Sequence, residues 1–213
     1  GAKPSSGDLP KPSKNLNKWI MGETSKVLNE VQISFESYRF NDAANALYAF
    51  IWGKVCDWYV ELSKPLFSSS NKQVIAETQE TMGWVIDQCL ILLHPIMPFI
   101  TEELWGSVGK RSNLLVHQNW PNYTTSDLIE PDADQEMNWV ISLIENIRSA
   151  RQQMHVPAGL KIPLIFQEMS ENAQETFERN SIMIMKLARI SEVEKISHFP
   201  KGTVAVNASG AIF

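Results

Sequence analysis

The stretch YRFNDAANALYAFIWGKVCDWYVELSKP, residues 38–65, decides the fold of this 213-residue chain. At about 100° per residue, its apolar side chains form one stripe of a helix that we expect to begin near Asn41 and to end before Pro65. The stripe comprises Phe40, Ala44, Leu47, Ile51, Val55, Trp58 and Leu62. A second face carries Asn41, Asn45, Tyr48, Trp52 and Tyr59. A helix that is apolar over so much of its circumference is usually central in a bundle.

Helical periodicity continues on both sides of this stretch. It predicts an amphipathic helix over residues 15–38 and further helices over 74–93 and 133–154. A short helical piece is expected to open at Thr101, and residues 106–131 are expected to be mostly loop. These elements indicate a helical bundle over most of the chain.

The pattern changes after Pro157. LKIPLIF, residues 160–166, is typical of a strand, whereas 171–180 and 182–189 are typical of helices. VEKISHF and TVAV, separated by Pro200, Lys201 and Gly202, are expected to form a hairpin. We therefore predict a mainly α fold. Its parts are a linker over residues 1–14, a helical bundle over 15–157 and a small α/β subdomain over 158–213.

Composition narrows the class of protein. The chain carries a net charge of −5, so any nucleic-acid contact has to be local rather than the effect of an overall basic field. No run of about 18 apolar residues and no signal sequence is present, which predicts a cytoplasmic protein without a membrane partner. Cys56 and Cys89 lack metal-ligand spacing and are expected to be buried thiols. The apolar end, GAIF, suggests a piece of a longer chain.

No catalytic motif stands out in the sequence. It holds no glycine-rich phosphate loop, no HExxH and no GxSxG, and its histidines are dispersed at positions 94, 117, 155 and 198. We therefore expect no catalytic, cofactor or metal site in this piece.

Two local features could contact RNA. Arg148, Arg151, Gln152 and His155 gather on one side of a helix, and guanidinium groups match phosphate oxygens well. The alternative is a solvated helix face. The aromatic face of residues 41–62 could stack on unpaired bases, although such a stripe is more often bundle interior. Lys54, Asp57 and Glu61 could equally form a solvated, salt-bridged face.

Three motifs in order carry a resemblance to a known family. They are residues 38–65, ILLHPIMPFITEELW at 91–105 and NIRSARQQMHVPAG at 146–159. Together they resemble the C-terminal part of the valyl-tRNA synthetases, which are class I aminoacyl-tRNA synthetases. The isoleucyl, leucyl, cysteinyl and methionyl enzymes share the bundle, but WGKVCDWYVELSKP looks most like the valyl version, and a cysteine-rich zinc module is absent from the sequence.

The resemblance implies an anticodon-binding helical bundle followed by a small α/β subdomain, ending before a coiled-coil arm. It implies a valine-tRNA ligase fragment that positions tRNA(Val) by its anticodon stem-loop beside the remainder of the synthetase. ATP and Mg would serve the full-length enzyme only, because the His-Ile-Gly-His and Lys-Met-Ser-Lys-Ser signatures are missing here. The implied tRNA-binding candidates are Trp52, Lys54, Asp57, Lys64, Arg148, Arg151 and His155, whereas Trp58 is assigned to packing.

Two rival functions are open at this point. A helical protein-interaction module without RNA binding would fit the acidic balance and the amphipathic helices, and its affinity would depend little on salt, unlike that of an RNA-binding module. An unrecognised enzyme would lose turnover when a single histidine is replaced.

Overall fold

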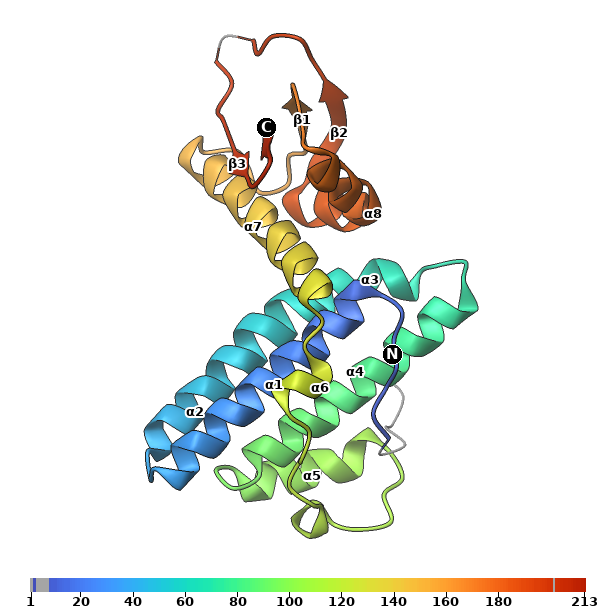
Figure 1. The fold of residues 1–213 in the computed structure, drawn as a ribbon, viewed down its shortest axis with the longest axis vertical. Coiled ribbons are helices and arrows are strands. Elements are labelled where there is room, and N and C mark those ends of the chain that lie inside the picture. Colours follow the sequence, from blue (N-terminus) through green and yellow to red (C-terminus); the bar gives the residue numbers. More distant parts are fainter. Residues whose placement is uncertain (1, 3–7, 201) are drawn as a thin grey trace. The chain divides into compact units, whose positions relative to one another are not determined.

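The computed structural model describes residues 2, 8–200 and 202–213. The chain forms two compact units, residues 1–134 and 135–213, and each unit is considered by itself (Figure 1). This division lies within a helix, earlier than Pro157, and the assignment of 15–157 and 158–213 as domains stays a prediction. Part of the predicted linker, residues 1 and 3–7, lies outside the described residues, and residues 8–14 form no helix or strand.

The 1–134 unit is helical. Its elements are α1 (Asn15–Glu36), α2 (Phe40–Tyr48), the π-helix η1 (Ala49–Tyr59), α3 (Val60–Phe67), α4 (Lys72–Leu93), α5 (Pro98–Val108), the 3₁₀-helix η2 (Leu115–His117), α6 (Thr125–Leu128) and the first residues of α7 (Pro131–Gln153). Helix α1 contacts α2, η1, α4 and α6 (Figure 1). The loop predicted over 106–131 contains the end of α5, two short helices and, at Pro131, the first residue of α7.

The core of this unit lies between α1 and its neighbours. Its most deeply buried large side chains are less than 2% exposed: Trp19, Ile20, Leu47, Tyr59, Leu62 and Leu92. Each such side chain stabilises the fold by about 1.5–3 kcal/mol. Of the predicted apolar stripe, Leu47, Val55, Trp58 and Leu62 are buried, whereas Phe40 at the start of α2 is exposed.

The stretch from Phe40 to Phe67 is one continuous helix with a π-helical middle. In a π-helix each N–H bonds to the carbonyl five residues back, so the side-chain register departs from 100° per residue. The helix begins at Phe40, with Arg39 at the N-cap, so the predicted start near Asn41 is confirmed to within one residue. It continues through Pro65 to Phe67, so the predicted end before Pro65 is wrong. Because Pro65 lacks an N–H, its place in the last turn costs one helical hydrogen bond.

Two side chains of η1 differ from what the sequence predicted. Tyr59, expected on the outer aromatic face, is 0% exposed, and its hydroxyl donates a 2.9 Å hydrogen bond to Asn17 Oδ1. Cys56 is exposed, so the prediction of a buried thiol there is wrong; at 100° per residue it already lies away from the apolar stripe that contains Val55. Cys89 is buried as predicted, and burial raises its pKa to about 12.

The 135–213 unit is the small α/β part. It holds the rest of α7, β1 (Ile162–Phe166), α8 (Glu171–Ala188), β2 (Ile190–Lys195), β3 (Asn207–Ala208) and β4 (Ala211–Ile212). Strands β1 and β2 pair in parallel, with Leu164 opposite Val193, and α8 is the crossover that a parallel pair requires. The mainly α fold with a small α/β part is therefore confirmed.

The predicted hairpin of VEKISHF with TVAV is wrong. Residues 193–195 belong to β2, which pairs with β1, and residues 203–206 form no strand; Lys201 lies outside the described residues. The antiparallel pair is instead β3 with β4. Its turn contains Gly210 at φ 79°, where an added Cβ would collide with the Ser170 hydroxyl.

Candidate nucleic-acid interface

Two aromatic rings project from the outer face of the long helix. Tyr48 is 67% exposed and Trp52 is 55% exposed, and their ring centroids lie 6.5 Å apart at an interplanar angle of 56°. Rings with more than half of their surface exposed leave room for a further flat group to stack on them. Trp52 was predicted as a stacking residue, and its position leaves that role open.

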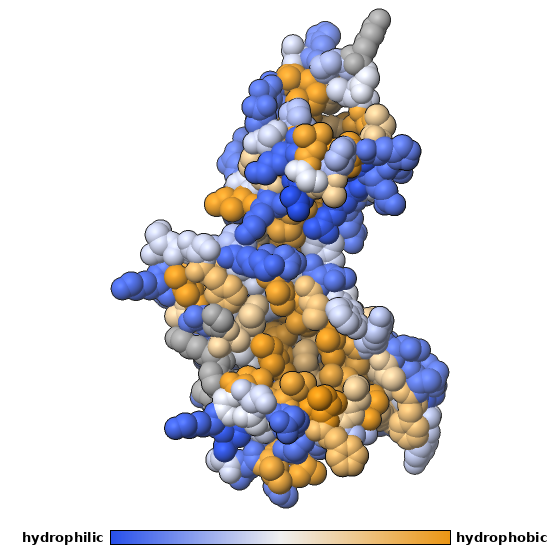
Figure 2. Space-filling model, turned by 180° about the vertical axis from the view of Figure 1, so that it is seen from behind, coloured by the Kyte–Doolittle hydropathy of each residue, from blue (hydrophilic) through white to orange (hydrophobic). Residues whose placement is uncertain are grey.

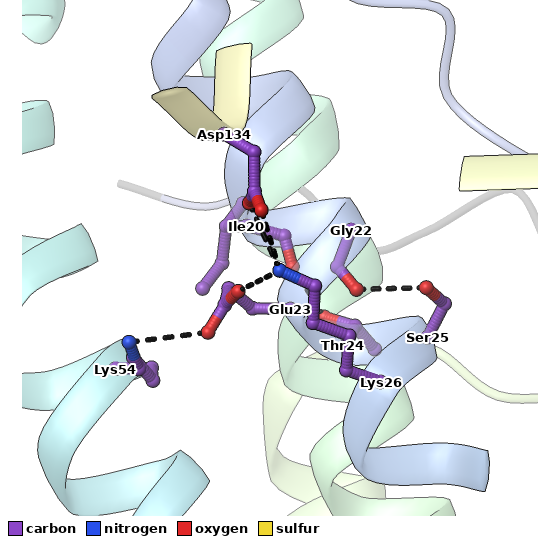
Figure 3. Close-up of polar contacts among 8 residues, drawn as sticks. All are labelled: Ile20, Gly22, Glu23, Thr24, Ser25, Lys26, Lys54 and Asp134. Atoms are coloured by element: carbon purple, nitrogen blue, oxygen red, sulfur yellow. Dashed lines mark hydrogen bonds and ion pairs between the residues drawn. The ribbon is translucent and has the colours of Figure 1, made fainter. Parts of the chain in front are cut away.

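Lys54 reaches from the same helix toward α1. Its Nζ lies 3.2 Å from Glu23 Oε2 (Figure 3). The same Nζ lies 5.7 Å from the centroid of the Trp19 ring. Glu23 also accepts a 2.7 Å hydrogen bond from Lys26, which pairs with Asp134 at 2.8 Å. Glu23 therefore holds two ammonium groups in place, and Lys54 is a fixed cation rather than a freely moving one.

Opposing influences act on the charge of Lys26. Burial lowers its pKa, but hydrogen bonds to Asp134 and Glu23, with the charges of both carboxylates, outweigh that effect and raise the pKa above its usual value. Lys26 thus stays protonated at physiological pH. Glu23, Lys26, Lys54 and Asp134 form one cluster of ion pairs (Figure 3).

An open groove of about 670 Å³ lies beside this cluster, between α1 and the α2–η1 helix. Its polar lining combines cations, carboxylates and amides: Glu23, Lys26, Asn29, Glu30, Arg39, Asp42, Asn45 and Lys54. Such a mixture can donate to and accept from the edges of unpaired bases. Lys54 is the one residue of this lining that was predicted from the sequence as a site residue, because the polar residues of α1 and of the start of α2 look like ordinary solvated helix faces.

Asp57 and Lys64 lie further along the long helix, and neither lines the groove. Both are exposed, and Lys64 forms an ion pair with Glu61 one turn earlier. A surface pair of this kind holds its charges loosely, since such pairs are worth about 0–1 kcal/mol. Their predicted contacts with RNA stay predictions.

The other predicted residues belong to the 135–213 unit, and the structure gives them different surroundings. Arg151 is 8% exposed, and its guanidinium donates to the carbonyls of Leu160 at 2.7 Å, Pro157 at 3.2 Å and Arg189 at 3.4 Å. A guanidinium engaged with three carbonyls has little left to offer a phosphate. Arg151 therefore stabilises the connection from α7 to β1, contrary to its expected place on an open cationic face.

Arg148 and His155 remain at the surface of that unit. The exposed Arg148 donates from Nε to the Leu187 carbonyl at 3.2 Å. His155 has φ 54°, and it forms the left-handed end of α7 together with hydrogen bonds from His155 N to Gln152 O and from Val156 N to Arg151 O. The left-handed turn exposes the imidazole, which can still meet a ligand.

None of the helices in residues 8–200 and 202–213 has the length and apolar character needed to cross a membrane. Within the same residues, His, Cys, Asp and Glu side chains do not gather in threes at a distance that would hold a metal ion.

Comparison with known proteins defines the class. Residues 17–166 match the family model described as the anticodon-binding domain of tRNA ligase, and the chain belongs to that family. The resemblance to the valyl-tRNA synthetases is confirmed by individual relatives. A valine–tRNA ligase of Ruegeria pomeroyi is 57% identical over 95% of this chain, and one of Cereibacter sphaeroides is 52% identical over 96%. One of Zymomonas mobilis is 43% identical over 92%.

The chain spans only part of these relatives. It covers 20% of the Ruegeria and Cereibacter ligases and 22% of the Zymomonas ligase. The matched part is therefore the anticodon-binding region, and about four fifths of each relative lies outside the match.

Proposed function

We propose that this chain binds tRNA(Val) through its anticodon stem-loop, as the anticodon-binding part of a valine–tRNA ligase. The family match over residues 17–166 and the valine–tRNA ligase relatives support this function. The observation that carries it is the exposed pair of rings, Tyr48 and Trp52, because single-stranded bases are bound largely by stacking on such rings.

The neighbouring groove supplies hydrogen-bonding groups for the same ligand. Asn45 lines the groove and lies three residues before Tyr48, so the two side chains are neighbours on the helix surface. Lys54, fixed by Glu23, would meet a phosphate or a base edge. In this proposal a base stacks on Trp52 while its edge or its neighbour faces the groove.

Asp57, Lys64, Arg148 and His155 are further candidates for contact with the stem-loop. Asp57 could accept from a base amino group, and the cations could contact phosphates. Arg151 enters the proposal only as the residue that holds the α7–β1 connection on which Arg148 and His155 depend.

The complete ligase would carry the chemistry elsewhere in its polypeptide. Activation of valine with ATP and Mg, and transfer to tRNA, would take place in the remainder of the synthetase in the cytoplasm, and this chain would only position the tRNA. A protein-interaction module without RNA binding is not favoured, because the family match is to an anticodon-binding domain.

A titration tests this function directly. The chain, taken to high concentration at two salt concentrations, is mixed with a tRNA(Val) anticodon hairpin and with a hairpin of altered anticodon. We expect tighter binding of the cognate hairpin, and affinity that falls linearly with the logarithm of salt concentration. Trp52→Ala is compared with Phe99→Ala, which removes another exposed ring, far along the chain from the groove residues.

The two variants should differ if the interface is assigned correctly. Trp52→Ala should weaken both hairpins, because stacking does not depend on base identity, and Phe99→Ala should leave binding unchanged. Absence of binding to either hairpin at low salt, or equal losses in the two variants, would contradict the proposal.

A further inference from the structure

Positively charged side chains surround the end of α8 in the 135–213 unit. Arg148 comes from α7, Lys161 precedes β1, and Lys186 and Arg189 lie three residues apart at the end of α8. All four side chains are exposed, and together they form the α8 cation surface. On the face drawn in Figure 2, much of the surface of this unit is hydrophilic.

Hydrogen bonds to the backbone bring these segments together. Arg148 Nε donates to the Leu187 carbonyl at 3.2 Å, in the last turn of α8. Ile162 N donates to the Arg189 carbonyl at 3.2 Å, so Lys161, the residue before Ile162, lies beside Arg189. The chain passes from α8 into β2 at Arg189 (Figure 1). Cations that are distant along the chain therefore share one surface.

Carboxylates are missing from the segments that form this surface. Residues 146–161 and 179–191 contain lysines and arginines but no aspartate or glutamate, although the whole chain has a net charge of −5. Among the described residues, no ion pair involves Lys161, Lys186 or Arg189. The negative end of the α8 dipole stabilises positive charges placed there. The α8 cation surface therefore keeps its charge available to an anionic partner.

The backbone of Arg189 has an unfavourable conformation. At φ 55° and ψ 56° it lies in the left-handed region, which costs glycine little and costs arginine more. The Arg189 N–H donates to the Met185 carbonyl and ends the helix, a position that glycine usually occupies. Strained residues of this kind cluster at functional sites. The strain therefore favours a role for the exposed Arg189 side chain itself.

The composition of the surface favours an RNA backbone over unpaired bases. Guanidinium and ammonium groups bind phosphate oxygens. Unpaired bases are bound by stacking on aromatic rings, and residues 146–161 and 179–191 contain no Trp, Tyr or Phe. Paired RNA is instead recognised by its shape and its phosphates. Arg148 and Lys161 also lie within residues 17–166, which match the anticodon-binding family.

We propose that the α8 cation surface binds the phosphate backbone of a paired stem of the tRNA, whatever the sequence of that stem. The proposal rests on the proposed function, and it adds Lys161, Lys186 and Arg189 to the residues that contact RNA. Tyr48 and Trp52 stack on unpaired bases, whereas the α8 cation surface supplies affinity that does not depend on sequence.

The salt dependence of binding to three RNAs tests the proposal. They are the tRNA(Val) anticodon hairpin, a hairpin of altered anticodon, and a blunt duplex that contains the stem of the hairpin without its loop. Each RNA is titrated with this chain over a series of salt concentrations. The variants are Arg189→Gly, Arg189→Lys and the combination of Lys161→Gln, Lys186→Gln and Arg189→Gly. The control is Lys195→Gln, which removes an exposed cation from the other end of β2.

We expect Arg189→Gly to lower the slope of log K against log salt concentration by about 1, and the combined variant to lower it by about 2–3. The two hairpins should lose affinity by the same factor. Arg189→Lys retains the charge and should retain the slope, and Lys195→Gln should leave the slope unchanged. The thermal midpoint of Arg189→Gly should not fall, because glycine adopts φ 55° without strain.

Several results would overturn the proposal. They are absence of duplex binding at low salt, an unchanged slope in the combined variant, and an equal change of slope in Lys195→Gln. A lower thermal midpoint of Arg189→Gly with unchanged RNA binding would give Arg189 a structural role only, against the proposal. Binding to vesicles that contain phosphatidylserine, lost in the combined variant while duplex binding stays intact, would assign the surface to an acidic membrane instead.

The duplex separates this proposal from the anticodon-binding function. Duplex binding with the expected slopes, but without tighter binding of the cognate hairpin, would refute only the anticodon-binding function. Preference for the cognate hairpin, with weaker binding in Trp52→Ala and an unchanged slope in the combined variant, would refute only the role of the α8 cation surface.

Discussion

Replacement of Arg151 by alanine should destabilise the 135–213 unit. The guanidinium is 8% exposed and donates to three carbonyls, of which only the 2.7 Å bond to Leu160 is short. A hydrogen bond to a charged donor is worth about 1.5–3 kcal/mol, and an unsatisfied buried carbonyl costs about 1–3 kcal/mol. We count the short bond at full value and give the two longer bonds little weight. The free energy of unfolding of the 135–213 unit should then fall by about 3 kcal/mol.

Hydrogen exchange measures this loss within the unit concerned. At about 1.4 kcal/mol per tenfold change, a loss of about 3 kcal/mol should accelerate exchange of the β1 amides roughly 100-fold. The control is Arg148→Ala, which removes the 3.2 Å bond to Leu187 from an exposed side chain and should change exchange less than about tenfold. Arg151→Lys should resemble the alanine variant, since a single ammonium cannot reach three carbonyls arranged for a planar fork.

A different result would support the contact between Arg151 and RNA that was predicted from the sequence. If Arg151→Ala leaves exchange and urea unfolding unchanged but weakens hairpin binding, the guanidinium is an RNA contact and the structural role assigned to it is wrong.

Three further outcomes follow from described contacts. Trp52→Ala should weaken hairpin binding by about 1–3 kcal/mol, or about 5- to 150-fold in Kd, with little change in thermal stability because the ring is 55% exposed. Tyr59→Phe should lower the free energy of unfolding by about 1–2 kcal/mol in urea titrations, since Asn17 loses a buried donor, and an unchanged midpoint would contradict this. Burial would raise the pKa of Glu77, but hydrogen bonds from Ser13, Lys14 and Asn17 outweigh burial and lower the pKa below 4.5. The stability that the Glu77 carboxylate contributes is therefore present above pH 4.5 and is lost as the pH falls through the folded pKa. Glu77→Gln should make the melting temperature depend less on pH over that acidic range. An unaltered dependence on pH would refute the stabilising role of the Glu77 carboxylate.

Most of the helices could be predicted from the sequence, because the periodicity that predicts a helix is local. The periodicity over 15–38, 74–93 and 133–154 predicted α1, α4 and α7 to within a few residues at each end. The mainly α fold followed from these helices, and the three motifs identified the family. By contrast, the pairing of β2 with β1 depends on a crossover, and two apolar runs close in sequence looked equally like a hairpin.

The surroundings of individual side chains were harder to predict from the sequence, because they depend on segments that are distant along the chain. Spacing at 100° per residue assumes an α-helix, so it could not reveal that Tyr59 of η1 is buried. The exposure of Cys56 agrees with that spacing, and the prediction of a buried thiol came instead from its apolar neighbours. Arg151 looked like part of an open cationic face, and its burial depends on carbonyls of the following loop and of Arg189. Glu23 and Lys26 gave no signal, since their importance comes from contact with Lys54 and Asp134.

The contact of Glu77 with the start of α1 also has a mechanical consequence. Ser13 donates from its N and Oγ, Lys14 from its N and Asn17 from its Nδ2, so four hydrogen bonds converge on one carboxylate of α4. A pulling force on the residues before Ser13 would load these four bonds before it reached the later turns of α1. The Glu77 contact therefore makes the beginning of α1 resistant to traction from the preceding chain, and single-molecule extension of Glu77→Gln should show α1 opening at a lower force.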